Sequence, residues 1–239
     1  MNNLINKINK KENTIMVICI LTIFAAIVFF FYLYSKEITE NNFVYANSLE
    51  EQILSISSKD DDVININLQD FSYYVIVAEA NTQSQALFFK EEAPVNYWEL
   101  KTSPIENVRS LTKEFCIETC IRDNILYMEA QKNNITLTEE ELEYVQEISY
   151  DIYISLTAQQ VDATNISLND INKAQEKIFL SEKYALSLVE SGTIEAKSEL
   201  SSNGAYYLEE IKTQYNIEEN NDLINELVFG SITVNPVKE

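Results

Sequence analysis

Apolar side chains recur at helical spacing through most of the chain beyond residue 67, and polar stretches separate the segments that carry them. A period of three to four residues predicts amphipathic helices that bury one face. The sequence holds only three glycines and three prolines, which agrees with long helices because both residues interrupt them. The predicted helices cover residues 68–89, 105–133, 139–157, 168–191, 204–215 and 217–229.

Three of these helices have a recognisable start. In a capping box, a Ser or Thr side chain accepts a hydrogen bond from the amide three residues on, and the acidic residue there bonds back to the amide of the cap. The residue pairs with this spacing are Ser103–Glu106, Thr138–Glu141 and Ser167–Asp170. The stretch from Ile121 to Leu168, around the second pair, gives the clearest signal, a helix–turn–helix. Gly192 is well placed to end the helix that starts after the third pair.

The segment 68–89 is ambiguous between helix and strand. Residues 73–77 are β-branched and aromatic, which suits a strand. Asn67 and Asp70 supply a helix cap, however, and the apolar residues from 71 to 89 fall near one helical face. We therefore favour a helix for this segment.

The sequence also predicts which helical faces are buried. In each helix the apolar members recur three or four residues apart, as a core-facing stripe does. At 105–133 they are Val108, Leu111, Phe115, Ile121, Ile125 and Met128. At 139–157 they are Leu142, Val145, Ser149, Ile152 and Leu156, and in the helix after Ser167 they are Ile171, Ala174, Ile178, Ala185 and Val189.

Two short β-like stretches flank the helices, Val63–Ile66 and Ile232–Val234. Pairing between them would close this part of the chain with a small two-stranded clasp, which we offer as a hypothesis. The polar residues 35–62 are interpreted as a linker with one short amphipathic piece at 48–56, opened by a capping box at Ser48. The acidic run at 59–62 lacks the Gly and the terminal Glu of a calcium loop and is interpreted as solvated linker.

Residues 14–34 carry no charge, and about 20 apolar residues suffice to cross a bilayer as a helix. Lysines at positions 7, 10 and 11 precede them, so the positive-inside rule keeps residues 1–13 in the cytoplasm and places the rest outside. A cleaved signal peptide is the alternative, but its apolar region spans only ~7–15 residues. The sequence therefore predicts an uncleaved, single-pass anchor in the cell membrane.

Composition excludes several functional classes. The net charge of −21 argues against nucleic-acid binding, which needs clustered Lys and Arg. Histidine is absent, which removes the commonest general base and the usual zinc ligands. Cys116 and Cys120 have no second pair to complete a metal site and are interpreted as small buried side chains rather than a redox pair. No cofactor or metal is predicted.

The order of elements resembles the N-terminal helical domain of the SurA and PrsA family of extracytoplasmic chaperone-foldases. The resemblance covers residues 63–235 and rests on "VININLQDF", on "LYMEAQKNNITLTEEEL" and on "NISLNDI". The matching positions of its central motif are Glu129, Ala130, Ile135, Thr138 and Glu139–Glu141. The resemblance implies a mainly helical chaperone-like lobe over residues 63–239, outside the membrane.

Isomerases of that family insert a parvulin domain before their C-terminal segment. The gap between Val189 and Ala205 is too short for such a domain, which spans ~100 residues. The parvulin active site also uses histidine, so the resemblance transfers no catalytic residue. Peptidyl-prolyl isomerase activity is therefore not supported by the residues.

The resemblance implies a protein that binds unfolded or exported polypeptides through apolar surfaces left between helices. The alternative is a structural or adaptor subunit of a cell-envelope assembly that binds one fixed partner. Aromatic side chains offer apolar area for such contacts, although large apolar side chains usually belong to the core. The candidate client-binding residues are Tyr73, Tyr74, Phe88, Phe89, Trp98, Tyr127, Tyr150 and Tyr153.

Overall fold

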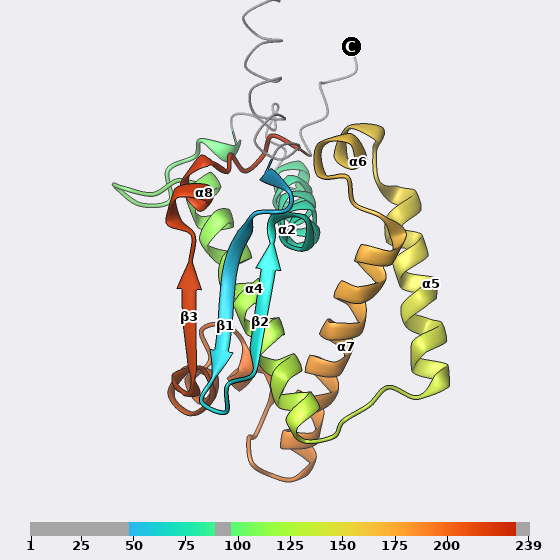
Figure 1. The fold of residues 1–239 in the computed structure, drawn as a ribbon. Helices are drawn as coiled ribbons and strands as arrows, with labels where there is room; N and C mark the ends of the chain where they lie inside the picture. The colour runs from blue at the N-terminus through green and yellow to red at the C-terminus, as the bar shows by residue number, and fades with distance from the viewer. Residues whose placement is uncertain (1–47, 89–96, 233–239) are drawn as a thin grey trace, which may run out of the picture. The chain divides into compact units, whose positions relative to one another are not determined.

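A small antiparallel sheet and a set of packed helices make up the part of the chain that this computed structural model describes, residues 48–88 and 97–232 (Figure 1). The mainly helical fold predicted from the sequence is confirmed. The anchor predicted at 14–34 lies outside the described residues. Within the described ranges, no helix combines the length and the hydropathy needed to cross a bilayer.

The sheet joins an early segment of the described chain to a late one. Its strands are β1 (Gln52–Ser58), β2 (Val63–Asn67) and β3 (Tyr215–Glu219), in the order β2-β1-β3. In the middle strand, Ser55 pairs with Asn65 of β2 and with Glu218 of β3. The acidic run at 59–62 forms the turn between β1 and β2, where Asp61 adopts a φ of 65°. This run is therefore a hairpin turn rather than part of an extended linker.

The sequence predicted β2 correctly and the other two strands incorrectly. The capping box at Ser48 yields one turn, in which the Glu51 amide donates to the Ser48 carbonyl at 2.8 Å, and β1 follows instead of a helix. The clasp hypothesis named the wrong partner, because β2 pairs with β1, and Ile232 lies in no strand. Residues 233–234 lie outside the described ranges. Strand pairing between distant segments decides these assignments, and local spacing does not record it.

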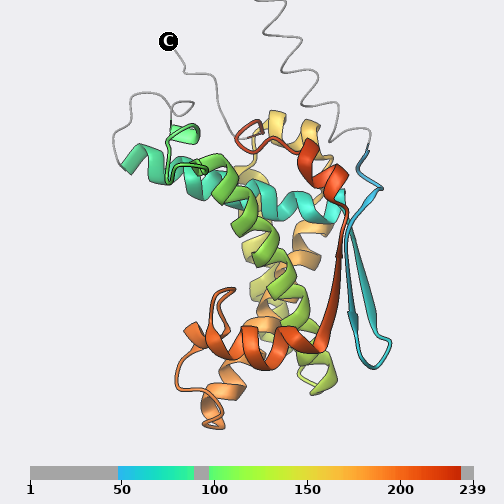
Figure 2. The ribbon, with the colours of Figure 1, turned by 90° about the vertical axis from the view of Figure 1, so that its left-hand side faces the viewer.

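The main helices occur where the sequence predicts them. They are α2 (Leu68–Phe88), α4 (Val108–Lys132), α5 (Glu139–Ser155), α6 (Ala158–Thr164) and α7 (Leu168–Glu190). Helix α7 packs against α4 and α5, while α2 packs against α4 (Figures 1 and 2). The short α6 was not predicted. It begins with its own capping box, Thr157 with Gln160, after the chain leaves α5 at the extended Leu156.

Hydrogen bonds confirm two of the three predicted capping boxes as helix starts. The Glu141 amide donates to Thr138 Oγ1 at 3.2 Å, and Glu141 returns a bond to the Thr138 amide at 2.7 Å. Ser167 and Asp170 form the same pair of bonds. Asn67 accepts from the Asp70 amide at 2.8 Å, as the cap of α2 requires.

The third box forms only in part and begins no helix, because the Ser103 amide donates to the Glu106 carbonyl at 3.4 Å rather than to the Glu106 side chain. The Glu106 amide donates to Ser103 Oγ at 3.1 Å, within a loop that is closed by a bridge between Lys101 and Asn107. Helix α4 begins at Val108 instead, capped by the Asn107 side chain, which accepts from the Ser110 amide at 3.0 Å. A local hydrogen-bond pattern is thus compatible with either a loop or a helix start.

Of the two helices predicted after residue 203, the one at 204–215 is confirmed as helical, whereas the one at 217–229 is largely wrong. Residues 205–214 coil as a helical turn with π and 3-10 geometry, but β3 then occupies 215–219. Of the helix predicted at 217–229, only Asn221–Glu226 is α-helical, as α8. An earlier 3-10 turn covers Lys197–Leu200.

The chain after α8 returns across α2 and is held there by buried contacts. Glu79 of α2, which is fully buried, accepts hydrogen bonds from the amides of Gly230, at 2.5 Å, and Ile232, at 3.2 Å. Gly230 has a φ of +84°, and a Cβ there would lie 2.8 Å from ring atoms of Trp98. Trp98, predicted in a loop, is itself buried against this segment. Glycine is therefore required at position 230 both for its backbone angle and for the space it leaves.

Candidate binding groove between α2 and α4

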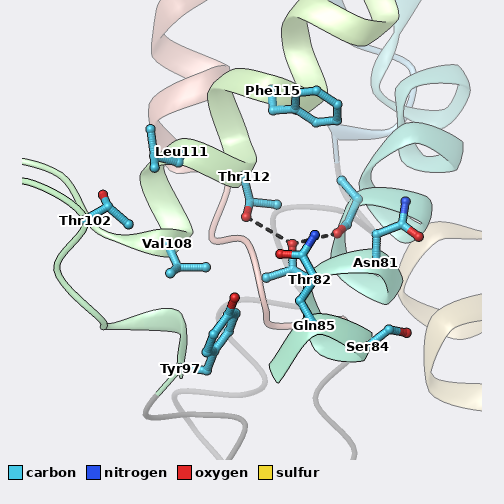
Figure 3. A pocket seen from close by; sticks show the side chains of 11 residues that line it. Asn81, Thr82, Ser84, Gln85, Tyr97, Thr102, Val108, Leu111, Thr112 and Phe115 are labelled. Carbon is cyan, nitrogen blue, oxygen red and sulfur yellow. Dashed lines mark hydrogen bonds between the residues drawn. The ribbon is translucent and has the colours of Figure 1, made fainter. Parts of the chain in front are cut away.

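A groove of ≈ 980 Å³ lies between the second half of α2 and the first half of α4 (Figure 3). The segment that leads into α4 adds Tyr97 and Thr102. The two helices contribute Ala78, Asn81, Thr82, Ser84 and Gln85 from α2, and Val108, Leu111, Thr112 and Phe115 from α4. None of these side chains carries a charge, so the groove favours an uncharged occupant.

Two buried threonines link the helices at this site. Thr82 Oγ1 and Thr112 Oγ1 lie 3.1 Å apart, as the dashed line in Figure 3 marks. Thr82 donates its own hydroxyl proton to the carbonyl of Ala78 at 2.9 Å, so Thr112 is the donor of the pair. This bond satisfies both hydroxyls and fixes the spacing of α2 and α4.

Two large apolar side chains on α4 face solvent beside these threonines. Leu111 is 37% exposed and Phe115 is 60% exposed. They follow one another by a single helical turn, so their side chains share one face. An exposed apolar pair on a groove wall is the kind of surface that binds another apolar group.

The prediction that Leu111 and Phe115 belong to the buried face of α4 is wrong. At 3.6 residues per turn, this pair points about 80° away from Ile121 and Ile125, which are almost fully buried. Continuing the stripe of the exposed pair by further turns reaches Glu118, a charged residue. A stripe that becomes charged along its length faces solvent, and this signal could have revealed the groove.

The predicted client-binding residues do not form one site in the structure. Tyr73, Tyr74 and Trp98 are buried in the core, where no client could reach them. Tyr127 and Tyr153 are half-buried, and Tyr150 is exposed on α5. Phe89 lies outside the described residues, as does the side chain of Phe88. None of these aromatic residues lines the groove, and three residues that do, Val108, Leu111 and Phe115, were assigned by the sequence to the core instead.

Three titratable groups of α4 with shifted pKa values, Cys116, Cys120 and Asp123, lie in the core rather than in the groove. Burial raises the pKa of the Cys116 and Cys120 thiols well above their usual range, which favours the neutral thiol. Both are free and buried, as expected for small core side chains. Burial also raises the pKa of Asp123 to about 6, against the opposing effect of Arg122. No perturbed acid or base faces the groove, so its geometry fits binding rather than proton transfer.

The described ranges, 48–88 and 97–232, contain no group of three or more Cys, Asp or Glu residues placed to hold a metal ion. No protein-family model, curated protein or solved structure matches the chain. The resemblance to the SurA and PrsA family therefore stays a prediction. The groove's own geometry is the main support for any function.

Proposed function

We propose that this protein binds unfolded or exported polypeptides in the groove between α2 and α4, as a membrane-anchored, extracytoplasmic chaperone-like protein without isomerase catalysis. The observation that carries the proposal is the uncharged groove with Leu111 and Phe115 exposed on its wall. Unfolded chains expose the apolar side chains that such a wall can bury, whereas folded proteins hide them.

The mix of polar groups in the groove supports a polypeptide as the occupant. Asn81 and Gln85 each carry an amide that can both donate and accept hydrogen bonds, as the backbone of an extended peptide requires. Val108 and Phe115 offer apolar area without a shape that selects one side chain. Such a surface binds many sequences weakly, which suits transient capture of clients.

The cellular setting is inferred from the sequence. The uncharged run at 14–34 would tether the protein, and the preceding lysines would keep the N-terminus in the cytoplasm. Residues 48–232 would then meet polypeptides as they emerge outside the membrane. This arrangement agrees with the chaperone lobe that the resemblance implies.

An aggregation assay tests the proposal. The full chain, reconstituted in phosphatidylcholine nanodiscs, is mixed at equimolar amounts with several unrelated unfolded proteins, and light scattering is followed. We expect it to suppress their aggregation and the double variant Leu111→Ser, Phe115→Ser to lose that effect. A matched control is Leu186→Ser with Leu208→Ser, two exposed leucines outside the groove, which should retain it.

The same assay separates chaperone from adaptor. Suppression that is unchanged in the groove variant would refute the groove as the client site. No suppression for any client, together with tight binding of one envelope protein that the groove variant abolishes, would instead establish the adaptor alternative. Empty nanodiscs control for capture by lipid.

A further inference from the structure

Helix α5 lies at one side of the helical layer and uses only one of its faces for packing (Figure 1). Val145 and Ser149 are buried on that face, and α7 is its main neighbour. The opposite face is unpartnered among the described residues. It carries both negative charge and large apolar side chains, a combination that a merely solvated helix does not need.

The charge on this face is of one sign and largely unpaired. Within the described residues, only Glu141 of α5 forms an ion pair, with Lys183 at 2.5 Å. The exposed carboxylates without such a pair are Glu139, Glu140, Glu143, Glu147 and Asp151. No lysine or arginine occurs between Lys132 and Lys173, so α5 itself carries no positive charge to balance these carboxylates.

Apolar side chains are interspersed with the carboxylates. Tyr150 is 55% exposed and Ile154 is 60% exposed, one turn apart. With Glu143 and Glu147 they form a single stripe, because successive members are three or four residues apart. Tyr144, 54% exposed, flanks the stripe. The apolar and the acidic groups therefore face the same partner.

We propose that this face of α5, called here the α5 stripe (Glu143, Glu147, Tyr150, Asp151 and Ile154), binds a polypeptide segment that combines lysine or arginine with apolar side chains. Cationic groups would pair with the three carboxylates, and the tyrosine ring offers a face for a guanidinium or an ammonium group. The isoleucine and tyrosine side chains would bury the apolar residues of the segment. This proposal stands independently of the groove, with which the stripe shares no residue.

Charge decides between this partner and others. A second copy of this chain, with its net charge of −21, would place like charges opposite one another, and so would nucleic acid or an anionic lipid surface. A metal ion needs converging ligands, and in the described part of the chain no such cluster exists. A segment that carries both cationic and apolar side chains is thus the partner that complements the carboxylates and the apolar residues of the stripe.

Fluorescence anisotropy on the full chain in phosphatidylcholine nanodiscs tests the proposal. The probe is a labelled synthetic peptide in which lysines and leucines alternate with serines. Its two comparison peptides replace the lysines by glutamates or the leucines by serines. We expect the first peptide alone to bind well, with an affinity that falls as salt rises.

The substitution set Glu143→Gln, Glu147→Gln and Asp151→Asn removes three charges without changing side-chain shape. Exposed ion pairs each contribute roughly two- to fivefold to binding, so the set should weaken the lysine–leucine peptide about tenfold or more. Ile154→Ser should reduce the preference for the leucine-containing peptide over the leucine-free one. The matched control, Glu190→Gln, Glu195→Gln and Glu209→Gln, changes net charge equally at exposed sites elsewhere and should bind within about twofold of the wild type.

Three results would overturn the proposal. The first is equal binding of the glutamate peptide. The second is equal weakening by the control set, which would show a response to net charge alone. The third is an absence of binding by the lysine–leucine peptide. Circular dichroism of each variant checks that α5 keeps its helix.

Discussion

The carboxylate of Glu79 accepts a hydrogen bond from the amide of Gly230 at 2.5 Å and so ties the middle of α2 to a residue 151 positions further along the chain. The same carboxylate reaches the amide of Ile232 at 3.2 Å. Since all of these groups are buried, the contact is a fixed part of the core. It also holds the helix that forms one wall of the groove.

Glu79→Gln should lower the free energy of unfolding by about 2 kcal/mol, because the amide group keeps one acceptor but turns a donor toward one of the two backbone amides. Urea denaturation followed by circular dichroism measures this loss. Exchange of the Gly230 and Ile232 amide protons should accelerate as well. Glu190→Gln, at an exposed site of α7, serves as the control, and an equal effect of the two substitutions would refute the proposed contact.

Gly230→Ala should destabilise the protein more than Gly192→Ala does. Both glycines have positive φ, +84° and +72°, but a Cβ at 192 meets nothing within 4 Å whereas one at 230 meets Trp98. We expect each substitution to lower the free energy of unfolding by about 1 kcal/mol through the backbone angle alone. Overpacking against Trp98 should lower it by roughly a further 1–3 kcal/mol at position 230. Thermal and urea unfolding measure both values. In a Trp98→Ala background the difference between the two glycines should vanish, and its persistence would contradict the steric explanation.

Phe115→Ser should leave stability within about 0.5 kcal/mol of the wild type, because most of the ring is already in water. Ile125→Ala, two to three turns along the same helix, should cost about 2–5 kcal/mol, since its side chain is fully buried. Urea denaturation of the two variants gives the comparison. A large loss for Phe115→Ser would mean that Phe115 supports the core rather than lining a free groove.

Asp123 should make the protein less stable as pH rises from about 4 to about 6. Burial raises its folded-state pKa from 3.8 to about 6, with Arg122 opposing this effect and Glu182 adding to it. The folded state therefore binds its proton more tightly than the unfolded state, so the stabilisation is complete below the unfolded pKa and is lost as pH passes the folded pKa. A shift of this size corresponds to about 3 kcal/mol, as an order of magnitude.

Asp123→Asn removes this titratable group. The difference in free energy of unfolding between wild type and variant should therefore change by about 3 kcal/mol across pH 4–6. Unfolding in urea at a series of pH values measures it. Glu182→Gln should move the decline to lower pH, because it removes a negative charge that raises the pKa of Asp123. A pH-independent difference between wild type and Asp123→Asn would refute the account.

Local signals predicted the helices well and the tertiary contacts poorly. Thr138 and Glu141 bond to each other only three residues apart, so the sequence alone reveals the start of α5. β3 exists because Ile217 pairs with Ile56, a contact between distant segments that no local pattern encodes. The same limit prevented prediction of the groove. The spacing of Leu111 suits a core residue, and only the packing of α2 against α4 shows that its side chain stays partly exposed.

The groove does not lie at the residues that the sequence proposed for client binding. An exposed apolar surface between helices was expected, and the structure has one. The aromatic residues proposed for it are instead buried where other elements cover them, as Tyr73 is by its contact with Gln175 of α7. Burial depends on the packing partner, so residue type alone could not assign Tyr73 to the core and Phe115 to the surface.

The pairing of β1 with β3 and of Glu79 with Gly230 has a consequence for biosynthesis. A nascent chain that has emerged only as far as α7 contains β1 and α2 but neither of their late partners. Until residues 215–232 follow, one edge of β1 and the Glu79 carboxylate have no native contact with them. We therefore expect the sheet and α2 to reach their final arrangement only after the ribosome has completed this region, so that the protein matures as a whole rather than segment by segment.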